Sequence, residues 1–175
     1  MFAVICIITA VSAASASLLV IDNFPSNQTE EHEGLFKQIE YITNDKSLQA
    51  KITVNSFQLT ADLAINNDQQ SKGLSVKDTL KENEGMLFVF KQPSRQGFWM
   101  KDMKFPIDII WLDANSTVVY VENNLKPCVS VLSCHVYVPD KNSLYVLETT
   151  AGFSQRHNVK IGTHVDLTLI RQEIP

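Results

Sequence analysis

The sequence has few basic residues and no cluster of them. Its 175 residues include 15 Lys and Arg against 19 Asp and Glu, for a formal net charge of -4. A protein that binds the phosphate backbone of nucleic acids gathers Lys and Arg on one surface, so we predict no nucleic-acid partner. The sequence also lacks a serine-nucleophile motif, a phosphate-binding loop and a dinucleotide fingerprint. These absences disfavour the enzyme classes built on them, and we predict no cofactor.

Charged residues are also missing from the whole stretch Phe2–Ile21. A run of this length can cross the hydrocarbon core of a bilayer as a helix. Ala14, Ser15 and Ala16 form the small-residue pattern that signal peptidase cleaves. Residues 1–21 are therefore interpreted as a cleaved signal peptide or a retained membrane anchor. Both alternatives predict an extracytoplasmic protein, secreted or anchored to the outer face of the cytoplasmic membrane.

The rest of the chain divides into a linker and one domain. A chain of this length holds one domain, or one domain plus a tether. Residues 22–50 are polar and aperiodic, as is typical of a linker. Residues 51–175 are expected to form the folded domain.

Short strands dominate that domain. Residues 57–65 alternate between apolar and polar side chains, and 86–90 are five apolar residues in a row. Residues 107–112 and 117–121 flank a four-residue connection, as in a β-hairpin. Two further strands are expected at 145–147 and 165–169.

Two short helices complete the expected elements. Asn66 can cap the start of one helix and Gly73 its end, while Thr149 or Thr150 can cap a second helix that runs to Asn158. The pattern predicts a mainly β sandwich or barrel of about seven or eight short strands. Because no long helix recurs between strands, a parallel βαβ sheet is not expected.

The cysteine pattern fits an exported protein. Cys6 lies in the uncharged N-terminal run, whereas Cys128 and Cys134 are separated by five residues. Outside the cytoplasm such a pair more often forms a disulfide than a metal site, and a short closed loop adds roughly 2 kcal/mol. The weaker alternative is a thiol-redox protein, or a metal site that adds His135 to the two cysteines and needs a fourth ligand. We predict the disulfide and no metal.

A series of short motifs occurs in order along the chain: Gly73-Leu74, Gly85–Phe90, Phe98–Lys101, Pro106–Asp108, Pro127-Cys128, Cys134, Tyr145–Glu148, Ala151-Gly152 and Gly162. Together these motifs resemble those of a known family. The resemblance covers residues 57–170 approximately and identifies the chain as similar to the domain of unknown function 192 (DUF-192) family. It implies a compact, jelly-roll-like, mainly β fold, often preceded by a signal peptide or lipid attachment, with no established activity.

The chain departs from the family pattern around Gly73-Leu74, and at the hairpin tip, where Asn115-Ser116 replaces the usual Gly. Gln70 and Lys77 stand where the family usually has arginines on either side of Gly73-Leu74. If those arginines clamp an anion in relatives, the bidentate fork is missing here, and Lys77 offers only a point charge.

Trp99 and Lys101 are the first candidates for a binding site. They alternate with Phe98 and Met100, so one pair should face the core and the other should face away from it. With Arg95 they could form a rim for a sugar or an anionic ligand, since an indole face attracts cations and stacks on sugars. The alternative is a Trp99 in the core and a solvated Lys101.

Two acids in apolar strands are the other candidates. Asp108 is expected to share a strand face with Ile110 and Leu112, and Glu148 closes a similar apolar strand. A carboxylate in such a place must be hydrogen-bonded, or its pKa rises. Each acid could serve a site or could hold backbone N–H groups.

Two functions follow from these candidates. The favoured one is a non-enzymatic binding or accessory module, with a concave site lined by Trp99, Lys101, Asp108 and Glu148 for an unknown small ligand or envelope protein. The alternative is a hydrolase-type enzyme in which Asp108 and Glu148 form an acid/base pair. That pair would need carboxyl groups about 5 to 10 Å apart across one cleft.

Overall fold

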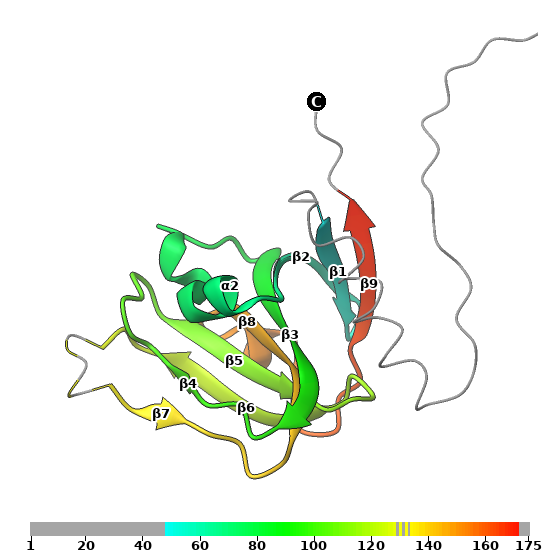
Figure 1. The fold of residues 1–175 in the computed structure, drawn as a ribbon. Helices are drawn as coiled ribbons and strands as arrows, with labels where there is room; N and C mark the ends of the chain where they lie inside the picture. Colours follow the sequence, from blue (N-terminus) through cyan, green and yellow to red (C-terminus); the bar gives the residue numbers. More distant parts are fainter. Residues whose placement is uncertain (1–47, 129, 131, 133, 172–175) are drawn as a thin grey trace, which may run out of the picture.

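The computed structural model describes residues 48–128, 130, 132 and 134–171 (Figure 1). In that part of the chain, nine strands form a seven-stranded sheet and a two-stranded ribbon. The elements are β1 (Leu48–Val54), β2 (Phe57–Ala64), α2 (Asn67–Lys72), the 3-10 helix η1 (Gly73–Val76), β3 (Glu84–Ser94), β4 (Phe98–Trp99), β5 (Ile107–Leu112), β6 (Val118–Leu125), β7 (Val136–Tyr137), β8 (Ser143–Thr150), α3 (Phe153–Arg156) and β9 (Asp166–Arg171). The fold is mainly β and sandwich-like, as predicted, and the large sheet is not closed into a barrel.

The large sheet has the strand order β6-β5-β8-β3-β2-β1-β9. All neighbours are antiparallel except β2 and β3, which run parallel. The sequence did not indicate this parallel pair, because no long helix separates the two strands. The short helices α2 and η1 make the crossover instead, and the Gln70 side chain fastens it by donating to the carbonyl oxygens of Ala64 (3.3 Å) and Val89 (3.0 Å).

The two α-helices begin in different ways. Asn66 caps α2 as predicted, because its side chain accepts a hydrogen bond from the Gln69 backbone N–H (2.9 Å). Gly73 ends α2 with φ of 50°, a left-handed value that suits glycine. The predicted threonine cap of the second helix is wrong, since α3 starts after Gly152, which has φ of 77° and provides no side-chain cap.

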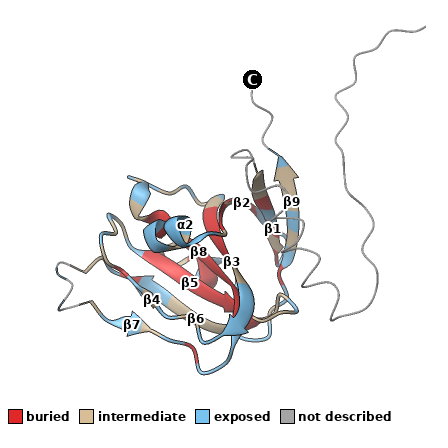
Figure 2. Ribbon diagram, viewed as in Figure 1, coloured by how far each residue is buried: buried red, intermediate tan, exposed pale blue. Residues whose placement is uncertain are grey.

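Each face of the central strands packs into its own hydrophobic core. Side chains alternate along β5 and β8, so both strands are buried on both faces (Figure 2). One core, the inner core, gathers Leu87, Ile110, Leu147 and Phe153 with residues of β1 and β2. The other, the outer core, gathers Phe88, Ile109, Trp111 and Val146 with Leu74 of η1.

The β4–β7 ribbon covers part of the outer core. Phe98 of β4 packs edge-to-face on Phe88 and Trp111, with ring centroids 4.8 and 5.8 Å away. The Trp111 indole N–H donates to the Gln96 carbonyl oxygen (2.8 Å), which fixes the chain just before β4. In Figure 1 the ribbon lies well away from β1 and β9, at the opposite side of the molecule.

Several predictions fall on the N-terminal part of the chain. The signal peptide or anchor at residues 1–21, Cys6, and residues 22–47 of the expected linker lie outside the described residues. Within the described part, no helix has the length and apolar character needed to span a bilayer.

Candidate functional site

Trp99 presents its indole to solvent. The alternation predicted for residues 98–101 is present: Met100 is buried and Phe98 packs inward, while Trp99 is 45% exposed. The alternative of a core Trp99 is therefore wrong. The second tryptophan, Trp111, is fully buried in the outer core.

Lys101 lies against Trp99. Its Nζ is 5.6 Å from the centre of the indole ring, within the range of a cation–π interaction. The same ammonium lies 3.3 Å from an Asp102 carboxylate oxygen. The Lys101 side chain therefore contacts both the indole ring and the Asp102 carboxylate.

Apolar side chains extend the exposed surface around Trp99. Val136 lies directly across the ribbon from Trp99 and is 48% exposed. Val138 is 41% exposed, and Leu132 is completely exposed. We call the surface formed by Trp99, Lys101, Val136 and Val138 the ribbon face. It carries three of the six exposed large apolar side chains among the described residues, and a fourth, Leu132, belongs to the segment between Cys128 and Cys134.

Gly97 shapes the ribbon face. A Cβ built at this position would lie 3.1 Å from a Val136 methyl carbon and 3.4 Å from one of Val138. Because Gly97 has no side chain, the side chains of Val136 and Val138 have room on this side of the ribbon.

Arg95 is held at the far end of the ribbon. Its Nε donates to the Pro139 carbonyl oxygen (2.7 Å), and a terminal nitrogen lies 3.9 Å from the Asp140 carboxylate. The ion pair is exposed and loose, so it contributes little. These contacts tie Arg95 to the segment after β7 instead of pointing it at Lys101.

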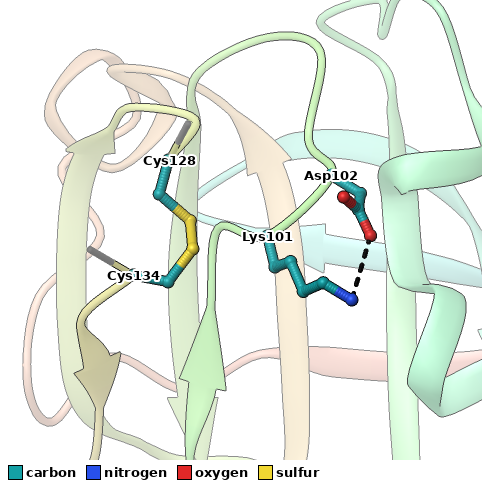
Figure 3. The surroundings of a disulfide bond; sticks show 4 residues. All are labelled: Lys101, Asp102, Cys128 and Cys134. Atoms are coloured by element: carbon teal, nitrogen blue, oxygen red, sulfur yellow. Dashed lines mark ion pairs between the residues drawn. A yellow bond between two sulfur atoms is a disulfide. The ribbon is translucent and has the colours of Figure 1, made fainter. Parts of the chain in front are cut away.

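A disulfide borders the ribbon face. Cys128 and Cys134 are bonded, with Cα atoms 5.3 Å apart, and Lys101 pairs with Cys128 in an isolated bridge (Figure 3). The predicted disulfide is thus present. A metal site at Cys128 and Cys134 would need free thiolates, which the disulfide removes. In the described part of the chain, no group of three His, Cys, Asp or Glu side chains is suited to a metal.

Removing the disulfide should loosen this edge without unfolding the protein. We expect the Cys128→Ser/Cys134→Ser double variant to lose roughly 2 kcal/mol of unfolding free energy, the loop-closure value for so short a loop. Urea denaturation of the oxidised wild type and the double variant measures the difference. Reduced wild type should match the double variant, and a wild type insensitive to reductant would contradict the prediction.

Asp108 holds backbone N–H groups. Its Oδ1 accepts hydrogen bonds from the backbone of Asn124 (2.7 Å) and Gly152 (2.8 Å), and its Oδ2 accepts one from Ser154 (2.8 Å). The residue is fully buried. The carboxylate therefore joins β6 to the turn before α3, which is the structural alternative considered for this residue.

Glu148 is buried in an apolar place. It is 4% exposed, lies on the same sheet face as Met86 and Ile109, and accepts one 3.3 Å hydrogen bond from the Leu74 backbone N–H. Burial raises the pKa of Glu148 to about 8, and the Leu74 hydrogen bond opposes this only in part. The side chain is thus a neutral acid at pH 7.

The site predicted from these two acids does not assemble. Asp108 pairs with Thr149 across β5 and β8, whereas Glu148 pairs with Ile109. Because successive side chains of a strand point to opposite faces, Asp108 faces the inner core and Glu148 faces the outer core. An acid/base pair across one cleft is therefore wrong, and so is a concave site lined by both acids together with Trp99 and Lys101.

A polar cluster that sequence reasoning missed lies at the C-terminal end of α3. The carboxylate of Glu82 accepts two hydrogen bonds from the Arg156 guanidinium (2.6 and 2.9 Å) and one from the Thr150 hydroxyl (2.6 Å). His157 Nε2 lies 2.8 Å from the same carboxylate. The Arg156 hydrogen bond is the main reason why the pKa of Glu82 is lowered to about 2. The cluster fastens α3 to the loop before β3. No sequence signal indicates it, because Glu82 and Arg156 are 74 residues apart.

The departures from the family pattern also have structural explanations. Gln70 fastens the β2–β3 crossover, as described above. Lys77 lies 2.7 Å from an Asp62 carboxylate oxygen. Both side chains are thus engaged within the protein, and neither contributes to the ribbon face.

The chain is similar to proteins of one family. A model of the family DUF192, described as "Uncharacterized ACR", matches residues 50–167. No curated protein matches the chain.

Two solved structures are similar to this one. A protein from Sinorhizobium meliloti 1021, provisionally described as a transcription regulator, is 24% identical with a TM-score of 0.62 and covers 70% of this chain and 95% of its own. A protein of unknown function from Novosphingobium aromaticivorans DSM 12444 is 28% identical with a TM-score of 0.59 and covers 67% of this chain and 83% of its own. These similarities show that the fold is shared.

Proposed function

The chain belongs to the DUF192 family of uncharacterized proteins, and we propose that it is a non-enzymatic binding module that acts outside the cytoplasm through its ribbon face. The observation that carries this proposal is the half-exposed Trp99 beside the Lys101 ammonium. A folded protein gains nothing by leaving an indole in water, whereas exposed tryptophans are common at binding surfaces.

The place of action is inferred from the disulfide and the N-terminal run. A Cys128–Cys134 bond persists in oxidising compartments and is rare in the cytosol. The uncharged residues Phe2–Ile21 have the composition of an export signal or an anchor. Both features support an extracytoplasmic module.

A binding role is favoured over catalysis for two reasons. Asp108 is saturated by three backbone donors, and Glu148 is buried on the other face of the sheet. Neither acid adjoins an exposed base or nucleophile in the contacts of the described residues. The ribbon face, in contrast, offers contact area and one charge, which suffice for binding.

A ligand panel tests this proposal on the full chain. We would titrate the protein with phospholipid vesicles, chitohexaose and inorganic phosphate, following tryptophan emission. At least one of these should bind, and Trp99→Ala should weaken that binding about tenfold or more, as expected for a central tryptophan at a contact.

Ile161→Ala provides the matched control, because Ile161 is 62% exposed and lies in the turn before β9. Its binding should equal that of the wild type. Binding that survives Trp99→Ala, or no binding to any of the three probes, would overturn the proposal.

A further inference from the structure

The partner of the ribbon face can be inferred from its chemistry. We propose that the ribbon face contacts the surface of a lipid bilayer, with Leu132 and Trp99 inserted at the level of the headgroups. This inference rests on the proposed function, because it assigns a partner to the same surface.

Leu132 gives the first argument. Its side chain is completely exposed, although it belongs to the segment closed by the Cys128–Cys134 disulfide. By sequence, the five residues between these cysteines, VSVLS, include no charged residue. A bilayer removes such a leucine from water without requiring a complementary pocket.

Trp99 and Lys101 give the second argument. Tryptophan is enriched at the membrane interface, where its ring contacts acyl chains and its N–H remains in the polar layer. Lysine in the same layer places its methylene stem among apolar groups and its ammonium among phosphates. The ammonium of Lys101 lies beside the Trp99 ring, so one surface presents both groups.

A sugar fits this surface less well. The Lys101 ammonium lies over the Trp99 ring, where a sugar would stack. The exposed apolar side chains of the ribbon face, Val136 and Val138, offer no hydrogen bonds to sugar hydroxyl groups, and the nearby Asp102 carboxylate is engaged by the Lys101 ammonium. An aliphatic environment of this kind matches acyl chains instead.

The length of the chain outside the described residues permits the contact. The uncharged run ends at Ile21 and β1 begins at Leu48. The intervening residues can extend up to roughly 90 Å, whereas a domain of this size has a radius of gyration of roughly 14 Å. A retained anchor would therefore hold the domain near the bilayer in any orientation, and the ribbon face could reach it although β1 lies at the other side of the molecule.

The two tryptophans make the contact directly measurable. We would mix the full chain with vesicles of phosphatidylcholine and phosphatidylglycerol whose acyl chains are brominated, since bromine quenches a nearby indole. Trp99 emission should shift to shorter wavelength, and most of it should be lost relative to unbrominated vesicles. The Trp99→Phe variant retains only Trp111, which is buried away from the vesicle. Its emission should therefore be nearly the same with brominated and unbrominated vesicles.

A second pair of variants tests the insertion of Leu132. Leu132→Ser should lower the equilibrium constant for contact about tenfold or more, the value of burying one leucine side chain. Ile161→Ser removes an equally simple exposed aliphatic group elsewhere and should leave quenching unchanged.

The outcomes separate this inference from the proposed function. Equal quenching of wild type and Trp99→Phe, or of wild type and Leu132→Ser, overturns the bilayer contact. If chitohexaose or phosphate then perturbs Trp99, the binding module stands with a soluble ligand. If none of the probes perturbs Trp99, both proposals fail.

Discussion

Asp108→Asn should lower the free energy of unfolding by about 3 kcal/mol, although the two side chains differ by a single group. An amide has one accepting oxygen, so its NH2 group must face at least one of the three backbone donors that Asp108 satisfies. Losing charge-assisted hydrogen bonds at a fully buried site, with an N–H left unpaired, costs that amount. Urea denaturation followed by fluorescence gives the difference.

Asp113→Asn is the matched control. Asp113 also accepts two backbone N–H groups, from Asn115 (2.8 Å) and Thr117 (2.9 Å), but both bonds end on Oδ1. Asparagine keeps that oxygen, and the hairpin turn is only partly buried, so the cost should stay below about 1 kcal/mol. Equal costs for the two variants would show that Asp108 is not the buried structural carboxylate described here.

Glu148 should make the protein less stable as pH rises. Its pKa is about 8 in the fold against an ordinary value of 4.5, so between these values the folded state holds a proton that the unfolded state has lost. The contribution of Glu148 to the unfolding free energy is then greatest below pH 4.5. It falls by about 1.4 kcal/mol per pH unit as pH rises toward 8, where the fall ends.

Glu148→Gln removes this dependence, because an amide of similar shape stays neutral at every pH. At pH 7 we expect the variant to be more stable than the wild type by about 3 kcal/mol, with the gap closing near pH 4.5. Urea denaturation from pH 4 to pH 9 measures both curves. Asp140→Asn, at a 98% exposed side chain, should follow the wild type. Parallel curves for the wild type and Glu148→Gln between about pH 4.5 and 8 would mean that Glu148 is ionised in the fold.

These two variants also bear on function. Both acids were candidates for one site, and both are expected to act on stability. Trp99→Ala, in contrast, should alter binding at little cost to the fold, because its indole is half-exposed. A binding effect at Trp99 combined with stability effects at Asp108 and Glu148 would separate the ribbon face from the two cores.

Features set by neighbouring residues were predicted well from the sequence. The alternation that buries Met100 and exposes Trp99, the Asn66 cap, the Gly73 end of α2 and the hairpin after Leu112 all depend on residues a few positions apart. The Cys128–Cys134 bond likewise closes a short loop. Local periodicity, capping chemistry and cysteine spacing are sufficient to predict these features.

The sequence by itself thus determined the fold class, the DUF192 family, the disulfide and the candidate residues. Only the tertiary structure decided how those residues combine. The faces of Asp108 and Glu148 depend on the pairing of β5 with β8, and a register shift of one residue between these strands would bring both side chains to one face. Likewise, the pairing of β4 with β7 places Val136 beside Trp99. Strand register arises from packing across the whole sheet, and no local pattern records it.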